Sequence, residues 1–318
     1  MSQRLSRRAA LRCLVGLALG GALAGPSRAA AQRAPAPTGL TAYQFGFRVW
    51  VRYNGFELTC YRAEPTQKYP YFYPFVGPAS GRSLTIESGQ PYPHHRSILF
   101  ACDRVNGANF WQQGTDRGQI VSRGPTIVRA DERAVVLADR CRWQAPAGQA
   151  VIADERRFTI TAPTPALRLL NAEITLSALA DIHISRTNHS LFAIRAAPDL
   201  APAGGGTLVN SAGRQGEKGT WGEKAQWCAF FAKRGEQVEG IALFDHPRNP
   251  WSPCPWFTRD YGFASPTPFY WLGQEGWSLA AGQSIRLRYL VVGFAGDPEQ
   301  AGLGDLFRRW ASGGLAPA

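Results

Sequence analysis

The sequence predicts an all-β protein: a large antiparallel β-sandwich with long loops and a short C-terminal helix. Short runs rich in β-branched and aromatic residues follow one another along most of the chain, separated by clusters of Gly, Pro, Asn or Asp. Residues 140–143, Arg-Cys-Arg-Trp, alternate polar and apolar side chains, as a strand with one face in water does. Because such strands bury their apolar faces against each other, we expect large sheets packed face to face.

The expected strands follow in chain order and leave little room for helices. They cover residues 45–51, 56–61, 97–101, 134–138, 150–152, 158–161, 167–175, 192–196, 225–232, 238–244 and 285–294. A helix is expected near the C-terminus, where Asp297 can cap it and Pro298 suits its first turn. Leu306, Phe307 and Trp310 then give this helix an apolar stripe.

The first 31 residues have the pattern of an export signal. Arg7 and Arg8 precede an apolar stretch, residues 13–23, and small residues at 29–31 suit a signal peptidase. The apolar stretch is shorter than the roughly 20 residues of a membrane-spanning helix. We therefore expect a twin-arginine signal peptide over 1–31, a linker over 32–40 and a single domain over 41–318. The expected location is the periplasm or the cell exterior.

Charge and cysteine content bound the partners and the chemistry. The net charge of +12 falls to +7 without the five arginines of the signal, and no dense Lys/Arg run remains to bind nucleic acid. Five cysteines remain after the signal, an odd number that leaves at least one thiol unpaired. No CxxC pair occurs, so most of these thiols are interpreted as small core residues. A small-molecule or oligosaccharide ligand is the expected partner.

Two long segments rich in aromatic residues and proline, 64–95 and 245–271, interrupt the strand pattern. A third segment, 210–222, is rich in glycine and charge and contains Trp221. Long ordered loops in a compact domain usually carry function, so these segments are the places to look for a site.

Two of the five histidines, His94 and His95, stand side by side in the first long segment. Imidazole exchanges protons near neutral pH, so either residue is a candidate general acid or base, with Arg96 binding substrate hydroxyls. Successive side chains of an extended chain point to opposite faces. This predicts that one imidazole faces the site while a hydrogen bond pins the other. The alternative is that both histidines only fix the loop.

A second candidate catalytic pair, Asp245 and His246, follows the expected strand 238–244. In this interpretation Asp245 orients His246 and fixes its tautomer, which adds a second proton-handling pair. The alternative is that Asp245 caps a turn ahead of Pro247.

Substrate-binding candidates come from both long segments and from the Gly-rich one. Arg259 and Asp260 can bind hydroxyls, although a plain surface ion pair has the same sequence. Aromatic faces bind the C–H faces of sugar rings, and core packing is the competing explanation for each aromatic residue. The predicted stacking platforms are Tyr71, Trp111, Trp221 and Trp256.

The common catalytic and cofactor motifs do not occur in the sequence. It has no GxSxG, no GxGxxG after a strand and no HExxH. The sequence therefore requires no cofactor and predicts no metal-ligand set. One alternative stays open, a divalent metal. It would be held by His94 or His95 together with His183, His189 or His246.

Six blocks of the chain are similar to the bacterial family labelled PmoA-like, or methane oxygenase-like. They are residues 68–74, the motif His94-His95-Arg96, and residues 106–111, 210–221, 240–249 and 255–262. The resemblance implies an exported β-sandwich protein that occurs alongside sugar-processing enzymes acting on keto-glycosides. Methane oxidation is rejected, because the true oxygenase subunit is an integral membrane protein and no apolar run here is long enough to span a bilayer. Residues 98–103 depart from the family's more Gly- and His-rich continuation, which weakens a catalytic or metal role for a histidine there.

The leading hypothesis is an exported enzyme that acts on a glycoside or modified sugar by His/Asp acid–base chemistry, as a lyase, an epimerase or a hydrolase. The alternative is a non-catalytic carbohydrate-binding or structural envelope protein. The enzyme hypothesis requires a particular geometry. His95, Asp245 and His246 must share one cleft with Trp111 or Trp256.

Overall fold

The computed structural model describes residues 38–112 and 114–315, which all belong to one compact unit, Ala36–Ala318. The predicted signal peptide and most of the predicted linker lie outside the described residues. The first strand begins at Leu40, which is 1% exposed, so ordered structure starts within the last residues of the predicted linker.

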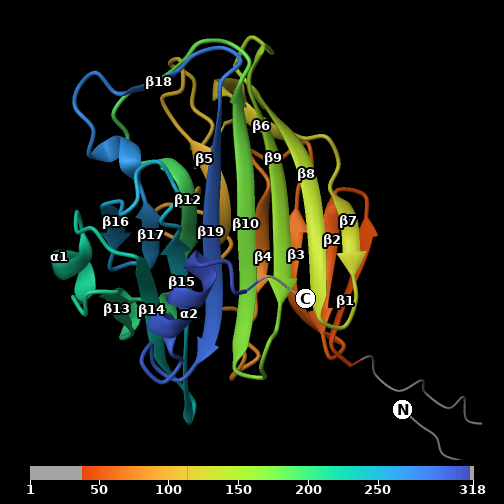
Figure 1. The fold of residues 1–318 in the computed structure, drawn as a ribbon, viewed down its shortest axis with the longest axis vertical. Helices are drawn as coiled ribbons and strands as arrows, with labels where there is room; N and C mark the ends of the chain where they lie inside the picture. Colours follow the sequence, from red (N-terminus) through yellow and green to blue (C-terminus); the bar gives the residue numbers. More distant parts are fainter. Residues whose placement is uncertain (1–37, 113, 316–318) are drawn as a thin grey trace, which may run out of the picture. The chain divides into compact units, whose positions relative to one another are not determined.

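Two large antiparallel sheets form the domain, as predicted (Figure 1). The first sheet has eight strands. In spatial order they are β1 (Leu40–Phe45), β2 (Arg48–Tyr53), β3 (Phe56–Arg62), β4 (Tyr71–Phe75), β5 (Ile98–Cys102), β12 (Ser190–Arg195), β17 (Phe263–Pro266) and β16 (Trp256–Arg259).

The second sheet has nine strands. In order they are β13 (Thr207–Asn210), β14 (Trp227–Arg234), β15 (Gln237–Asp245), β19 (Ser284–Ala295), β10 (Leu167–Ala178), β9 (Ala150–Thr161), β8 (Ala134–Gln144) and β6 (Gln119–Ser122), with β7 (Thr126–Ala130) also paired to β8.

The remaining elements are short. A small sheet joins β11 (Ile182–Ile184) to β18 (Trp277–Leu279), and the helices are α1 (Gly216–Thr220) and α2 (Leu303–Ala311). Turns of 3₁₀ helix lie at Thr115–Arg117, Pro198–Leu200, Pro202–Gly204 and Pro268–Tyr270. Within the described part of the chain, no helix is both long and apolar enough to cross a membrane.

The core lies between the two large sheets because every second side chain of their strands points inward. Phe192 of β12 stacks on Tyr289 of β19 with ring centroids 4.8 Å apart. Phe72 of β4 meets Phe158 of β9 edge to face, also at 4.8 Å. These cross-sheet contacts define which face of each strand is internal. Cys60, Cys102, Cys141, Cys228 and Cys254 are all free and buried, and most of them were predicted to be core residues.

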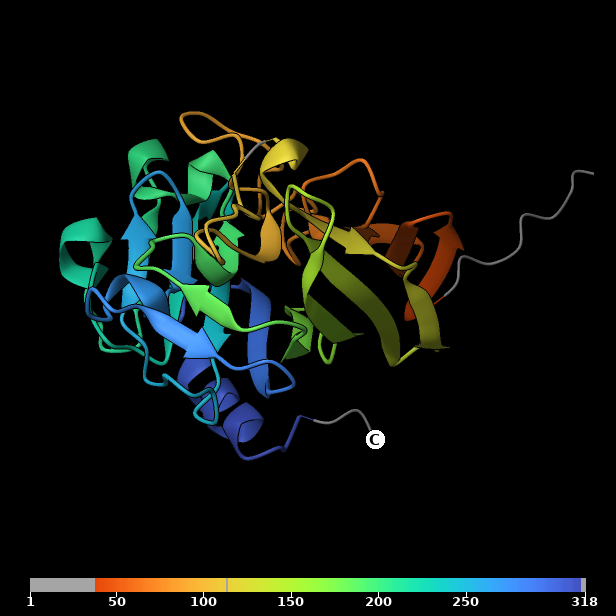
Figure 2. The same ribbon diagram turned by 90° about the horizontal axis from the view of Figure 1, so that it is seen from above.

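Different elements cover the two outer faces (Figure 2). α2 packs its apolar stripe on the outer face of the nine-stranded sheet, where Phe307 and Trp310 contact Phe244. Loops between β3 and β8 cover the eight-stranded sheet on the opposite side. Lys68 joins two of these loops, because its ammonium donates to the carbonyl oxygens of Asn109 and Gly118.

The long segments and the helix differ from their predicted extent. Segment 64–95 contains β4, and segment 245–271 contains β16 and β17. These short strands were not predicted because proline within a run argues against a strand. The C-terminal helix is confirmed but starts at Leu303. Asp297 instead accepts backbone hydrogen bonds in a preceding turn, and Gly302 (φ 63°) separates that turn from the helix.

Candidate metal centre

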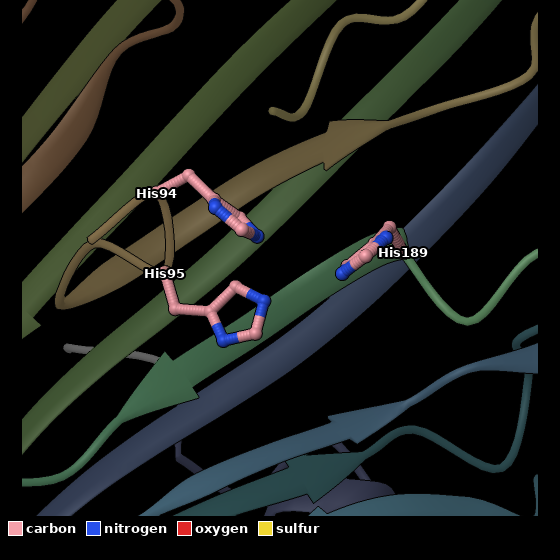
Figure 3. Close-up of side chains that lie close together, drawn as sticks. All are labelled: His94, His95 and His189. Carbon is pink, nitrogen blue, oxygen red and sulfur yellow. The ribbon is translucent and has the colours of Figure 1, made fainter. Parts of the chain in front are cut away.

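Strand pairing brings three histidines together from two distant parts of the chain. His94 and His95 lie in the loop before β5, and His189 directly precedes β12. β5 and β12 pair with Ser190 opposite Cys102, which places His189 beside Asp103. Figure 3 shows both rings of the loop directed toward His189. The three residues therefore form one site on the eight-stranded sheet.

The three imidazoles are close enough to share an ion. Ring centroids are 4.5 Å apart for His94 and His95, 5.6 Å for His94 and His189, and 5.4 Å for His95 and His189. One ligand nitrogen of each residue lies within 4.8 Å of those of the other two. Tetrahedral ligands of zinc lie about 3.4 Å apart, so modest side-chain rotations would close the three nitrogens around one ion.

The prediction that His94 and His95 point to opposite faces is wrong. Residues 91–96 form a turn and not an extended strand, and the backbone N–H of His95 donates to the carbonyl of Tyr92 over 3.1 Å. Period-two alternation applies only to extended chain, so both side chains reach the same site.

Burial keeps two of the imidazoles uncharged. It lowers the pKa of His95 to about 2, with further lowering by the neighbouring histidines and by Arg195 and Arg259. Burial also lowers the pKa of His94 to about 4, with His189 contributing. A neutral imidazole keeps one ring nitrogen with a free lone pair, which is the form that binds metal.

A carboxylate orients the third histidine. The Nδ1 of His189 lies 3.3 Å from Oδ2 of Asp103, which is buried and also accepts a hydrogen bond from the hydroxyl of Thr187. A carboxylate bonded to Nδ1 fixes the proton there and leaves Nε2 to bind an ion, as in many carboxylate–histidine–metal arrangements.

Aromatic side chains enclose the cluster. Phe263 lies 4.3 Å from the His95 ring, Trp111 lies 5.4 Å from the His189 ring, and Tyr92 lies 5.9 Å from the His94 ring. The hydroxyl of Tyr261 is 3.4 Å from Nδ1 of His95. This wall excludes water from much of the site and leaves Tyr92, 43% exposed, at its rim.

Buried polar atoms without partners gather at this cluster. They include Nε2 of His94, Nε2 of His95 and Nε1 of Trp111. Buried polar groups are nearly always hydrogen-bonded, and unsatisfied groups that cluster indicate a bound ion or a functional site. Converging imidazoles with one carboxylate behind them suit a divalent transition metal such as zinc.

The second predicted catalytic pair lies elsewhere, so the proposed combination of His95 with Asp245 and His246 is wrong. Asp245 faces the interior between the sheets, where Oδ1 accepts from the amide of Asn249 over 2.7 Å. His246 faces outward against Trp310 of α2, with ring centroids 4.7 Å apart. The geometric condition for the acid–base hypothesis is met for Trp111 and fails for this pair.

The predicted stacking platforms are mostly core residues. Trp111 and Trp256 are fully buried, and Trp256 donates its indole N–H to the carbonyl of Ala225. Tyr71 is also buried and bonds Arg96, whose Nη1 lies 3.2 Å from the phenol oxygen. Trp221 is partly exposed but packs on Trp271, with ring centroids 5.0 Å apart. Core packing therefore explains most of these aromatic residues.

Arg259 and Asp260 hold α1 in place. Arg259 pairs with the carboxylate of Glu217 at 3.0 Å, and Asp260 accepts a hydrogen bond from the backbone N–H of Glu217 at 2.7 Å. Both carboxylates and the guanidinium are thus occupied by structural contacts, although Arg259 pairs with Glu217 and not with its neighbour Asp260.

Sequence reasoning did not single out Asp103, Tyr92 or Tyr261 as parts of this site, and His189 entered only as one of several metal partners. Asp103 joins the site through the long-range pairing of β5 with β12, and Tyr261 through the turn before β17, so no local spacing signals either residue. Tyr92 lies in the same turn as His94 and His95. Of the other histidines, His183 lies exposed on β11, outside the cluster.

The comparisons with known proteins identify a family and a partial structural likeness. Residues 48–308 match the model of a family of unknown function (DUF6807), so the chain belongs to that family. No curated protein matches the sequence.

Solved structures that resemble the fold include proteins described as sugar epimerases, all with very different sequences. Galactose 1-epimerase from Lactobacillus acidophilus NCFM has a TM-score of 0.40 and 8% identity, covering 82% of this chain and 99% of its own. A candidate aldose 1-epimerase from Escherichia coli K12 has a TM-score of 0.34 and 13% identity, with coverage of 81% and 98%. An aldose epimerase homologue from C. elegans has a TM-score of 0.33 and 9% identity, with coverage of 81% and 96%. Likeness at this level transfers neither activity nor site residues.

Proposed function

We propose that this DUF6807 protein is a metal-dependent enzyme that acts on a sugar or modified glycoside. The observation that carries the proposal is the convergence of His94, His95 and His189, with buried ring nitrogens that have no partner in the described structure. The oriented pair Asp103–His189 replaces Asp245–His246 as the His/Asp element of the site.

The site has the parts that a metal-assisted proton transfer requires. Three imidazoles leave at least one coordination position for a water or a substrate oxygen. A divalent metal held by the three imidazoles would polarise a substrate carbonyl, or lower the pKa of a hydroxyl, bound at that open position. Lyase, epimerase and hydrolase reactions all use such polarisation. The proposal therefore covers these three reaction types and does not select one of them.

A sugar ring suits the rim of the site. Tyr92 is exposed and lies 5.3 Å from Tyr261, measured between ring centroids, so the two aromatic faces offer a surface beside the metal position. Aromatic faces favour the apolar faces of sugar rings, which places hydroxyls toward the histidines. Tyr92 thus takes the role that the sequence prediction gave to Trp111.

The metal is tested first, because it can be measured without a substrate. Purified protein loaded with Zn²⁺ should retain about one equivalent after gel filtration, by elemental analysis. His95→Ala and His189→Ala should lose most of it, whereas His183→Ala, a histidine on β11 outside the cluster, should keep it. Retention of metal by all three variants would exclude this cluster as the centre.

Turnover is tested on native and oxidised glycosides with the same variants. We expect product formation from the metal-loaded wild type and from His183→Ala, and its loss after chelation or in His189→Ala. A protein that binds one metal and the sugars yet turns over none of them would be a binding protein, which is the alternative hypothesis.

Export is a separate part of the proposal and rests on residues 1–31 alone. Fusion of this segment to a reporter that matures only after twin-arginine transport should give signal outside the cytoplasm. Replacement of Arg7 and Arg8 by lysine should abolish it. An unchanged signal in that variant would contradict the proposed route.

A further inference from the structure

A second candidate site lies on the opposite outer face, under α2. A cavity of about 360 Å³ opens between the nine-stranded sheet and this helix, within the size range of small-ligand pockets. Strands β9, β10 and β19 form its floor, and His246 stands at its edge. Its lining includes Thr159, Asn171, His246, Arg248, Arg288 and Trp310.

The lining carries excess positive charge. Glu173 pairs with Arg286 across β10 and β19. Within residues 38–112 and 114–315, Arg248 and Arg288 have no acidic partner within 4.0 Å. Burial lowers the pKa of Arg288, and repulsion from Arg286 and from Arg248 lowers it further. An anion bound between Arg248 and Arg288 would relieve this repulsion.

His246 is a fixed hydrogen-bond donor in this cavity. Its Nδ1 accepts from the backbone N–H of Arg248 over 3.0 Å, so in the neutral ring the proton is on Nε2. Burial lowers the pKa of His246 to about 4, and Arg288 and Arg248 contribute, so the ring stays neutral near pH 7. Neutral His246 can therefore donate to a hydroxyl or to an anionic oxygen.

Trp310 gives the cavity an apolar wall. Its indole N–H donates to Oδ1 of Asn171 over 2.8 Å, which holds the ring and directs the Asn171 amide nitrogen away as a further donor. Thr159 and Thr161 add hydroxyls on the sheet floor. An indole face can pack against a hydroxylated ring while the surrounding donors form hydrogen bonds to its hydroxyl groups.

We propose that this cavity binds a small hydroxylated ring that carries one anionic group, either a sugar carboxylate or a sugar phosphate. The guanidiniums of Arg248 and Arg288 bind the anionic oxygens, and His246, Asn171 and the threonines bind hydroxyls.

This site is separate from the histidine cluster. Tyr289 points into the core onto Phe192, so Arg288 and Leu290, its neighbours on β19, point to the outer face under α2. The histidine cluster lies beside β5 and β12, which belong to the eight-stranded sheet. Binding at one site can thus be measured while the other is disabled.

Isothermal titration calorimetry on the full-length protein tests the proposal. The probes are galacturonate, glucuronate, glucose 6-phosphate, inorganic phosphate and glucose. We expect at least one charged sugar to bind, and Arg288→Met to raise its Kd at least about tenfold. Arg248→Met, an exposed position that puts folding at little risk, should act in the same direction. Arg309→Met is the control, because it removes the same charge from an exposed position on α2 outside the cavity.

Each outcome decides the proposal. Preference for a uronate or for the sugar phosphate supports it and identifies the anionic group. Binding of inorganic phosphate as tight as that of every charged sugar would show that the ring is not recognised and would overturn it. No binding of any charged sugar, or equal losses in Arg288→Met and Arg309→Met, would overturn it as well.

Discussion

Asp103 shows how one side chain can define the role of another. Its carboxylate contacts Nδ1 of His189 and the hydroxyl of Thr187, so it fixes the ring but is not one of the three converging candidate ligands. Asp103 is therefore a positioning residue. Its effect on function should pass through the affinity for metal and not through contact with substrate.

Asp103→Asn should weaken zinc binding by about 10- to 100-fold, the usual effect of removing a carboxylate behind a metal-binding histidine. The amide is nearly isosteric, so the fold should be retained. Competition with a fluorescent chelator measures the affinity, and circular dichroism checks the fold. Unchanged affinity in this variant would show that Asp103 only supports the loop. Asp305→Asn, on the exposed face of α2, is the control.

At the scale of elements, β15 ends with a buried carboxylate that holds the following loop. Asp245 bonds Asn249, whose amide also donates to the carbonyl of Arg288, so the end of β15, the loop and β19 are joined. Burial raises the pKa of Asp245 to about 6, against partial lowering by its hydrogen bonds. This carboxylate is consequently costly when ionised and has a structural role.

The raised pKa predicts a stability loss as pH rises. Between about pH 4 and pH 6 the unfolded state releases the proton while the folded state keeps it, so the free energy of unfolding should fall by about 3 kcal/mol. Asp245→Asn should lack this part of the decrease. Urea denaturation of both proteins from pH 4 to pH 8 measures the difference. Parallel pH profiles for the two proteins would contradict the assignment.

At the scale of the whole molecule, a buried ion pair on β9 lies in the interior of the sandwich. Arg156 donates to both oxygens of Asp154 at 2.7 and 2.8 Å, and Trp143 donates to the same carboxylate at 2.7 Å. The guanidinium also lies 5.5 Å from the ring centre of Phe100 on the other sheet. Through this contact with Phe100, the ion pair of β9 packs against the inner face of the eight-stranded sheet.

Asp154→Ala should destabilise the fold by about 3–5 kcal/mol, because it leaves Arg156 buried and uncompensated. The double change Asp154→Leu with Arg156→Met should cost less, since it removes both charges. Glu155→Ala is the matched control: its pair with Arg140 is exposed and should contribute no more than about 1 kcal/mol. Equal effects of the two single changes in urea denaturation would refute this account.

Local sequence patterns were sufficient for the fold class and for the longer strands, whereas short strands such as β6, β7, β11, β13 and β18 were not predicted. The alternation at 140–143 and the apolar run at 134–138 are both parts of β8, and the runs at 150–152 and 158–161 are both parts of β9. These patterns are local, so they can be recognised in the sequence without knowing which strand pairs with which. Residues 45–51 were mistaken for one strand because the turn between β1 and β2 is flanked by apolar residues.

The sequence by itself determined an all-β chain and marked His94 and His95 as unusual. Only the tertiary structure decided which residues join them, because the pairing of β5 with β12 spans a separation that no local pattern encodes. The alternation rule failed for His94 and His95, which lie in a turn. It does apply at the end of β15, where Asp245 faces the core and His246 the outer cavity. Backbone conformation, which depends on the surrounding fold, therefore decided which neighbours in sequence share a site.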